Sequence, residues 1–410
     1  MQGKNILVIG GGASGMMAAI SALENGASVT IAEKENRLGK KVLVTGNGRC
    51  NVTNMNITAE NYHGANPLLT NNIFAQFDNK QTISFFNNLG VVTKVEERGR
   101  VFPMSDQASS VVDILTHRLK DLGAKIIYET KVEDIKKIGD EFKVRFSNNT
   151  EAAFDRVVIA AGGKAMPALG SDGSGYTLSE SLGHTVTPTW PSLVQLRLEG
   201  GFFNEIKGVK IDGSAALVAN DKAVAKESGE ILFTHYGVSG PAILKLSRKA
   251  KEHIVAGEKV TLRLTLLNGL DEEKLDKFLA DRFNMLHKKA IKTSFLGFLQ
   301  KRLIPEVLKA AQIENADKKC AEISANERKN IVKTLLAWDF PVIDTNSFKD
   351  AQVTAGGVNT NEVDAKTLES KIVPGLYFCG EVLDIDGDSG GYNLQFAWSS
   401  GYIAGRSATK

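Results

Sequence analysis

The sequence lacks the features of a secreted, metal-dependent or membrane-spanning protein. Its 410 residues include only three cysteines, Cys50, Cys320 and Cys379, at spacings that match neither a disulfide framework nor a zinc site. No apolar run approaches the roughly 18 residues that a membrane helix needs. The formal net charge of +3 is too small to argue for a nucleic-acid partner. We therefore expect a cytoplasmic protein of two or three domains, with no metal site and no membrane partner.

The most informative motif lies at the start of the chain. A short apolar strand leads into a G-x-G-x-x-G turn that begins at Gly10 and ends at Gly15, and an Ala-rich helix follows. A second apolar strand ends at Glu33, eighteen residues after the last of these glycines. This is the βαβ pattern that binds dinucleotides, because the glycines let backbone approach a pyrophosphate and the acid accepts hydrogen bonds from ribose. The residues that we expect at the cofactor here are Gly10, Gly12, Ala13, Ser14, Gly15, Glu33 and Lys34.

A strand near the other end of the chain favours FAD over NAD. The apolar run at residues 375–379 is followed by Gly380 and Glu381, a glycine-rich turn and a final helix from about Asn393. A simple NAD domain does not need this segment, whereas FAD enzymes of this architecture use the acid to hold the ribityl or phosphate region. The N-terminus of the final helix can stabilise negative charge at the N1/C2=O edge of a reduced flavin. The residues concerned are Gly380, Glu381, Asp384, Asn393, Leu394 and Gln395.

The sequence pattern changes twice between these two ends. Strand and helix signals alternate up to about residue 190 and return near Phe340. The intervening sequence first alternates with period two, as in a small barrel or sandwich, and then becomes helical. We therefore predict a dinucleotide-binding domain of residues 1–190 and 338–410, an inserted β-rich domain of residues 191–268 and a helical domain of residues 269–337.

Motifs spread over nearly the whole chain resemble those of the aminoacetone oxidase-like bacterial flavoproteins. Besides the two end segments, the resemblance rests on Thr45–Asn51, Phe233–Pro241 and Thr354–Val358. This family is also described as NAD(FAD)-utilising dehydrogenases and is related to the fumarate reductase flavoprotein type. The resemblance implies an α/β fold with a Rossmann-like FAD-binding domain of the glutathione reductase or fumarate reductase type, an inserted β-barrel-like domain and a helical domain. Activities in that family include oxidation of a small amino ketone and reduction of unsaturated bile-acid intermediates.

The resemblance implies further residues at the cofactor. It places the loop around Arg49 against the pyrophosphate and the flavin, where a planar, permanently charged guanidinium suits phosphate. It places Val132 where related folds bind adenine through their backbone, and it places Gly356 and Gly357 beside the flavin, where they would leave room for substrate. The chain has no clear match to the catalytic arginine set of the fumarate reductase type, which argues against dicarboxylate chemistry. The full set is Gly39, Lys40, Lys41, Thr45, Gly46, Arg49, Cys50, Asn51, Val132, Ala160, Ala161, Gly162, Gly356 and Gly357.

One residue of the inserted region is the best candidate for proton transfer. His235 lies just before Ser239–Pro241, a segment that predicts a helix N-terminus. It is the best general acid or base among six histidines, although a lone histidine is more often structural. Cys50 and Cys379 lack the close spacing of flavin disulfide reductases, so we do not predict a redox dithiol.

These residues predict an FAD-dependent oxidoreductase that moves hydride between flavin N5 and an unidentified small molecule. Two versions fit, an oxidase of an amine or amino ketone and a double-bond reductase that takes electrons from NAD(P)H. The alternative is an FAD-dependent RNA-modifying or RNA-binding flavoprotein, because basic residues recur between Lys245 and Arg302. Solvated helix faces explain these charges better, so nucleic acid is not the favoured partner. The late Gly–Glu strand, which is the run at residues 375–379 with Gly380 and Glu381, argues against a third option, a plain NAD dehydrogenase.

Overall fold

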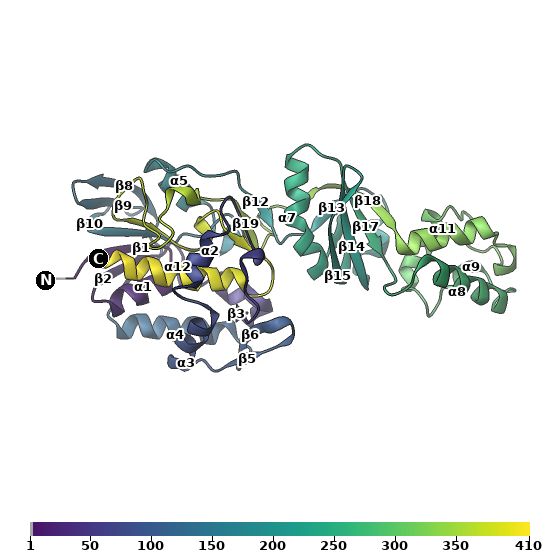
Figure 1. Cartoon of the computed structure of the whole chain (residues 1–410), viewed down its shortest axis with the longest axis horizontal. Coiled ribbons are helices and arrows are strands. Elements are labelled where there is room, and N and C mark those ends of the chain that lie inside the picture. Colours follow the sequence, from purple (N-terminus) through teal and green to yellow (C-terminus); the bar gives the residue numbers. More distant parts are fainter. Residues whose placement is uncertain (1–2) are drawn as a thin grey trace. The chain divides into compact units, whose positions relative to one another are not determined.

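The structure is a computed structural model that describes residues 3–410. The chain divides into two compact units, Met1–Pro191 with Phe348–Lys410, and Ser192–Ser347. Figure 1 shows their elements, coloured along the sequence. The second unit is an insertion in the first, so both ends of the chain belong to the first unit, and each unit has its own apolar core.

The first unit is built on a five-stranded parallel sheet. Its strand order is β20-β11-β1-β2-β7, and every neighbouring pair runs parallel. Ile6, Leu7 and Val8 of β1 are fully buried, as in a parallel sheet with both faces covered. This sheet confirms the α/β fold that the sequence predicts. The strands are β1 (Asn5–Ile9), β2 (Ser28–Ala32), β7 (Lys125–Ile127), β11 (Arg156–Ile159) and β20 (Leu376–Phe378).

The first and the last helix of the chain lie against each other in this unit (Figure 1). They are α1 (Ala13–Glu24) and α12 (Tyr392–Ala408). Two glycines of α12 permit contact between the helix backbones. A Cβ atom on Gly401 would clash with the backbone oxygen of Ser14, and one on Gly405 would clash with that of Ala18. The final helix is thereby fixed against the helix that follows the G-x-G-x-x-G turn.

Smaller elements complete the first unit. They include the three-stranded sheets β10-β9-β8 and β3-β6-β5 and the two-stranded pairs β21-β4 and β12-β19. The strands are β3 (Thr53–Asn54), β4 (Tyr62–His63), β5 (Thr93–Val95), β6 (Arg100–Pro103), β8 (Val132–Ile138), β9 (Glu141–Phe146), β10 (Glu151–Phe154), β12 (Trp190–Ser192), β19 (Val353–Ala355) and β21 (Asp386–Gly387). The helices are α2 (Leu69–Phe74), α3 (Asn79–Asn88), α4 (Ala108–Asp121) and α5 (Ser174–Ser181).

The second unit contains a closed six-stranded barrel with the strand order β13-β16-β15-β14-β17-β18. The last strand, β18, pairs with β17 on one side and with β13 on the other, so it closes the barrel and removes the free edges. Residues 338–345 therefore belong to the barrel and not to the dinucleotide-binding domain, where the sequence analysis placed them. The first unit resumes at Phe348. The strands are β13 (Leu196–Leu198), β14 (Lys210–Ala219), β15 (Lys222–Thr234), β16 (Gly237–Ser239), β17 (Val260–Thr265) and β18 (Trp338–Thr345).

Helices follow the barrel strand β17 and share one apolar core with the barrel. The N–H of Leu266 donates to the backbone oxygen of Leu335 (2.8 Å), which ties α11 to the end of β17. The separation of a helical domain from the barrel near residue 268 stays a prediction. None of the helices in the described part of the chain combines the length and the apolar character that crossing a membrane requires. The helices of this unit are α6 (Phe203–Ile206), α7 (Pro241–Val255), α8 (Glu272–Met285), α9 (Ile291–Ser294), α10 (Ile304–Ala310) and α11 (Ala325–Leu336).

Candidate functional site

The turn between β1 and α1 leaves the N-terminus of the helix accessible. Gly10 has a φ of +99°, and a Cβ atom on it would lie 2.6 Å from the backbone oxygen of Ala160. Gly15 packs in the same way against the backbone of Gly10. Gly12 is the N-cap of α1 and gives the helix no side-chain cap, and a Cβ atom on Gly12 would meet nothing within 4 Å. The first N–H groups of α1 are therefore placed to bind a pyrophosphate.

Glu33 follows β2 and reaches this turn. Its Oε2 accepts a hydrogen bond from the N–H of Gly11 (2.6 Å), and its Oε1 accepts one from the N–H of Glu35 (2.9 Å). Burial raises the pKa of Glu33, although the two hydrogen bonds oppose this effect. The backbone oxygen of Glu33 accepts from the N–H of Thr130 (3.0 Å), which brings Val132, the first residue of β8, to the same end of the site. This is the end where a dinucleotide site binds ribose and adenine.

Two lysines that the sequence places at the cofactor form ion pairs within the chain. Lys34 pairs with Asp172 (2.6 Å), and Lys40 pairs with Glu35 (2.6 Å). Burial opposes the charge of Asp172, but Lys34 and hydrogen bonds from Ser174 outweigh it and lower the pKa of Asp172 to about 2. These pairs hold the loop that follows β2, and direct contact of either lysine with phosphate stays a prediction.

Arg49 belongs to an ion-pair network with two carboxylates. Its guanidinium donates to Glu96 and, over 2.6 and 2.8 Å, to Asp106. It also lies over the ring of Phe102, 4.1 Å from the centroid, and Lys94 adds an ion pair of 2.5 Å with Asp106. Two carboxylates take up most of its donors in this structure, and the contact of Arg49 with the pyrophosphate stays a prediction.

The end of β20 meets the start of α1. The hydroxyl of Ser14 donates to the backbone oxygen of Cys379 (3.3 Å), and the chain then continues into Gly380 and Glu381. Oε2 of Glu381 pairs with Nζ of Lys41 (2.8 Å), and Oε1 accepts from the N–H of Thr354 (3.0 Å). Ala160 and Ala161, which follow β11, lie against Gly10 of the same turn, while Gly162 faces Ser171. Segments from four parts of the sequence thus meet around the G-x-G-x-x-G turn.

The N-terminus of α12 forms the other end of the site. Gly391 is its N-cap, with a φ of +102° and no side-chain cap. The side chain of Asn393 bonds to the N–H and the oxygen of Gly387 (2.8 and 2.7 Å) and fixes the turn that leads into the helix, while Leu394 is half-buried in the first turn. Oδ1 of Asn51, a residue only 8% exposed, has no hydrogen-bond partner among the described residues. It would lie 3.0 Å from a Cβ atom on Gly391.

These two ends fit FAD. The N-terminus of α1 suits a pyrophosphate, and Glu33 suits a ribose. The N-terminus of α12 suits the C2=O edge of the flavin, and the partnerless oxygen of Asn51 is an acceptor for a ring N–H at that edge. Gly401, which packs on Ser14, lies nine residues along α12 from its first residue, so this stretch of the helix measures roughly 13 Å at 1.5 Å per residue. In FAD, a ribityl chain joins groups of these two kinds.

Three predicted residues are buried inside the fold. Gln395 is fully buried, and its amide is bonded to the hydroxyls of Thr53 (2.5 Å) and Thr82 (2.8 Å). Gly356 and Gly357 were expected to leave room over the flavin. A Cβ atom on Gly356 would instead clash with a backbone oxygen, and one on Gly357 would lie 2.7 Å from another. Close backbone packing therefore requires glycine at both positions, and their place beside the flavin stays a prediction.

The other predicted residues shape the loops of the site. Gly39 and Gly46 have φ values of +69° and +56°, a conformation that favours glycine. The hydroxyl of Thr45 donates to a backbone oxygen of its own turn (2.7 Å). Burial raises the pKa of the neighbouring Cys50 to about 12, so its thiol is inert. Asp384 is buried and accepts from a backbone N–H (3.1 Å).

His235 lies in the second unit, at the exposed turn between β15 and β16. Its ring stands edge-on to that of Tyr236, with the centroids 4.7 Å apart. No other ring or polar partner of His235 is present in the described part of the chain, and its catalytic role stays a prediction.

Two features of the first unit were not predicted from the sequence. His63 of β4 pairs with Asp388, which lies between β21 and α12 (3.0 Å between Nε2 and Oδ1). Tyr176 is buried, its hydroxyl has no hydrogen-bond partner among the described residues, and burial followed by the charges of Glu381 and nearby aspartates raises its pKa well above the usual value. His63 stands in a polar stretch without any periodic pattern, so no local signal marked it.

Several known proteins are similar in sequence to this chain over nearly its full length. Residues 4–407 match the family described as HI0933-like protein Rossmann domain. The chain is 38% identical over 409 residues to a 3-dehydro-bile acid delta(4,6)-reductase of Clostridium scindens, which covers 99% of both chains. It is 32% identical to a ribosomal RNA dihydrouridine synthase of Haemophilus influenzae, over 98% of both. A solved flavocytochrome c3 fumarate reductase is similar over 99% of this chain and 78% of that one, with 16% identity and a TM-score of 0.47.

The family match spans both ends of the site, from the fingerprint to the last helix. The predicted Rossmann-type FAD-binding domain is confirmed, and the protein is an FAD-dependent oxidoreductase, as the sequence predicts. The finer resemblance to aminoacetone oxidases stays a prediction. The chain belongs to the HI0933-like family of FAD-binding Rossmann proteins.

Proposed function

We propose that the protein reduces a carbon–carbon double bond conjugated to a carbonyl group. The observation that carries this proposal is the uncapped N-terminus of α12 beside the partnerless oxygen of Asn51, a place suited to the negative charge of a reduced flavin. The names of both curated relatives support the same chemistry. Reducing a 3-dehydro bile acid and forming a dihydrouridine both saturate a double bond conjugated to a carbonyl.

Different residues of the first unit would hold different parts of the cofactor. When bound, FAD supplies the hydride, from N5 of its reduced form. The N-terminus of α1 would bind the pyrophosphate, Glu33 would bind the ribose, and Glu381 with Lys41 would hold the region between pyrophosphate and ring. The N-terminus of α12 would stabilise negative charge on the reduced ring. NAD(P)H is the proposed electron donor.

The favoured substrate is a small, steroid-like enone. Its support is the sequence identity, which is 38% to the bile acid reductase and 32% to the dihydrouridine synthase, each over nearly the full length. The competing version within the same enzyme class is an oxidase of an amine or amino ketone, which would transfer hydride in the opposite direction and use oxygen.

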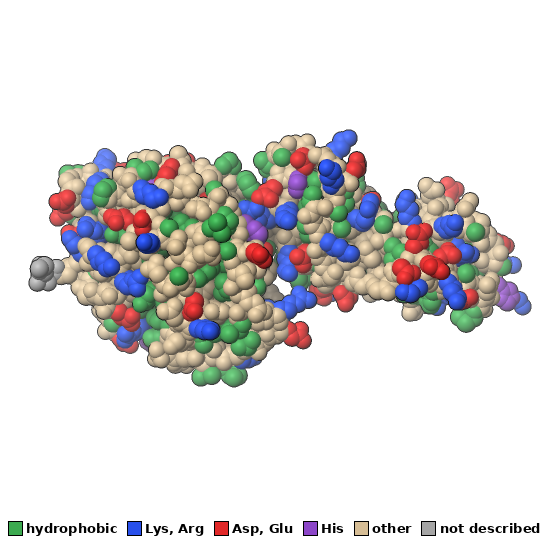
Figure 2. Space-filling model, in the orientation of Figure 1, with side chains coloured by type: hydrophobic (Ala, Val, Ile, Leu, Met, Phe, Trp, Pro, Cys, Tyr) green, Lys and Arg blue, Asp and Glu red, His purple; other side chains and the backbone are tan. Residues whose placement is uncertain are grey.

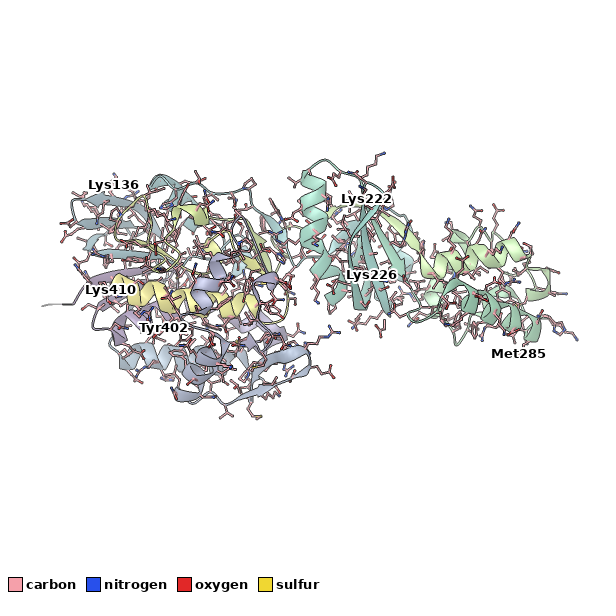
Figure 3. The ribbon with its side chains drawn as sticks, viewed as in Figure 1. Lys136, Lys222, Lys226, Met285, Tyr402 and Lys410 are labelled. Atoms are coloured by element: carbon pink, nitrogen blue, oxygen red, sulfur yellow. The ribbon has the colours of Figure 1, made fainter. Side chains whose placement is uncertain are left out.

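A uridine in RNA is the second candidate substrate, and one surface favours it. The second unit carries 25 Lys and Arg against 20 Asp and Glu. In its helical part Phe278, Met285 and Leu296 are 40%, 69% and 47% exposed. Figure 3 labels Met285, and Figure 2 shows basic side chains among acidic ones over the same helices. Exposed apolar and aromatic side chains among lysines can stack on unpaired bases.

One anaerobic experiment separates these functions. The holoprotein is reduced by light and mixed with a 3-oxo-4-ene steroid, with 2-cyclohexenone or with a uridine-containing RNA hairpin, and flavin absorbance is followed. We expect the steroid to reoxidise the flavin fastest, with a product heavier by two hydrogens. Fast reoxidation by the hairpin alone would select the RNA substrate. Reduction of the oxidised flavin by an amino ketone, with no response to any enone, would overturn the proposal in favour of the oxidase.

A further inference from the structure

The pair of His63 and Asp388 lies beside the N-terminus of α12. His63 closes β4 and stands opposite Asp386 of β21 in an antiparallel pair. Its Nε2 is 3.0 Å from Oδ1 of Asp388. The backbone of Asp388 is fixed as well, since its N–H donates to the oxygen of Asn61 (2.9 Å) and its oxygen accepts from the side chain of Asn393 (3.2 Å) in the first turn of α12. The pair is thus part of the turn that leads into α12, at the end of the site that would hold the flavin.

The pair is partly accessible to solvent, and neither of the other two described histidines of this unit combines access with a carboxylate partner. The side chains of His63 and Asp388 are 29% and 36% exposed. His184 is buried against Glu362, and His117 is exposed on α4 with no carboxylate partner among the described residues. Among the residues that the structure describes, only His63 combines a carboxylate partner, partial exposure and a place at this end of the site.

The proposed reduction needs an acid at this place. Hydride adds to the β-carbon of the enone, the electron pair of the double bond moves toward the carbonyl as an enolate, and the α-carbon then takes a proton. Histidine is the side chain that most often supplies such a proton near neutral pH. A carboxylate on one ring nitrogen fixes the orientation of the ring and stabilises its protonated form, leaving the other nitrogen to deliver the proton.

We propose that His63, oriented by Asp388, is the acid that protonates the α-carbon of the substrate. This rests on the proposed reductase function. The reduced FAD gives two electrons and one hydrogen as hydride, His63 gives the proton from Nδ1, and the substrate gains both across its double bond. Oxidised FAD and neutral imidazole remain, and solvent returns the proton to His63. Asp388 is a positioning residue.

Neighbouring groups do not compete for this role. The hydroxyl of Tyr62 donates to the backbone oxygen of Tyr392 (3.0 Å). Burial, followed by nearby charges that include Asp388, raises the pKa of both Tyr62 and Tyr392, so these phenols hold their protons. Asp386 faces His63 from the paired strand and is buried. It can add negative charge near the imidazole but has no path to solvent of its own.

The test compares two half-reactions of the anaerobically reduced holoprotein. We expect His63→Gln to slow flavin reoxidation by 2-cyclohexenone or the steroid enone by about 100-fold or more, the range for loss of a general acid. Reoxidation by oxygen, which needs no such acid, should stay within about twofold, and so should FAD content. Asp388→Asn should slow the enone reaction by about tenfold, and added imidazole should rescue His63→Gly.

Matched controls come from the other histidines. His253 pairs with Glu258 in the second unit (2.6 Å), so His253→Gln tests the loss of a comparable pair and should leave every rate unchanged. His235→Gln tests the acid that the sequence suggests. If His235→Gln rather than His63→Gln abolishes the enone reaction, our inference is overturned. If His63→Gln reacts like wild type, the inference fails while the reductase function stands.

A binding measurement gives a readout independent of turnover. In holoprotein labelled with ¹⁵N-histidine, saturating cyclohexanone, a ketone that cannot be reduced by hydride addition to a double bond, should shift the ring signals of His63 and not those of His253. Unshifted His63 signals would contradict direct contact with substrate. If the wild type reacts with no enone at all, it is the proposed function that fails.

Discussion

Lys41 and Glu381 stand 340 positions apart in the sequence, yet Nζ and Oε2 form an ion pair of 2.8 Å. Their side chains are 21% and 20% exposed. The same carboxylate accepts from the N–H of Thr354, so one side chain joins three distant segments. This pair links the loop after the fingerprint to the late Gly–Glu strand, the two features that together predict FAD.

Replacing Lys41 tests whether this link serves the cofactor. In Lys41→Met, Glu381 keeps its charge in a half-buried place without a counter-ion, and its segment shifts. We expect FAD affinity to fall by about tenfold, or about 1.4 kcal/mol, measured by recovery of flavin fluorescence on dilution. Lys318→Met is the matched control, because Lys318 pairs with Glu327 (2.7 Å) at similar exposure in the second unit. Equal FAD affinity in both variants would contradict the assignment.

Gly12 gives a test that separates binding from folding. A Cβ atom on Gly12 would meet nothing within 4 Å, and its φ of −75° suits any residue, so Gly12→Ala should leave the melting temperature of the apoprotein unchanged. The added methyl would stand where backbone must approach a pyrophosphate, and FAD affinity should fall by at least about tenfold. Gly201→Ala is the control, because Gly201 is equally open. Unaltered FAD titration of Gly12→Ala would remove α1 from the binding site.

The contact between α1 and α12 should be required for both stability and cofactor. Gly405→Val introduces a side chain against the backbone oxygen of Ala18, in a contact that has no room for one. Overpacking of this kind costs about 1–3 kcal/mol. We expect a lower urea midpoint and weaker FAD retention, because the N-terminus of α12 moves with the helix. A variant that keeps wild-type stability would show that the helices separate without cost.

His184 predicts an acid-sensitive stability. Its Nδ1 contacts Glu362 (3.0 Å) and its Nε2 contacts the hydroxyl of Ser370 (2.7 Å). Burial lowers its pKa below 6.5, against the opposing effect of Glu362, so the folded state takes up its proton less readily than the unfolded state. Its contribution is therefore complete above about pH 6.5 and declines as the pH falls below that value.

Urea unfolding at pH 7.5, 6.5 and 5.5 measures this effect. Wild type should lose stability between the last two values. His184→Gln cannot serve both partners, so it should be about 2 kcal/mol less stable at pH 7.5 and lose less of its stability on acidification. His117→Gln, at an exposed position of α4, is the control. Parallel pH profiles for wild type and His184→Gln would contradict this account.

The sequence predicts the parts of this protein that depend on local pattern. Three features can be recognised from the sequence: the glycines of the G-x-G-x-x-G turn, Glu33, and the strand that ends at Gly380 and Glu381. Each combines a residue type with a strand or helix end at fixed spacing. The barrel also follows from alternation with period two. Its last strand was assigned to the wrong domain, because β18 alternates like any strand and only its pairing with β13 shows where it belongs.

The parts that depend on tertiary contacts could not be predicted. Arg49 has the right chemistry for phosphate, but Glu96 and Asp106, which neutralise it, lie far along the chain. Gln395 follows directly after the helix N-terminus in sequence, yet the helical turn directs it into the core. The pair of His63 and Asp388 joins residues 325 positions apart. Neither residue carries a local signal.

Whether the bound flavin reduces a conjugated double bond is decided by one anaerobic mixing experiment. Anaerobically photoreduced holoprotein is mixed with a 3-oxo-4-ene steroid, and both the flavin spectrum and the mass of the steroid are recorded. We predict that the oxidised flavin spectrum returns in step with a steroid two hydrogens heavier. A flavin that stays reduced under the enone and reoxidises only when oxygen is admitted would contradict the proposed function.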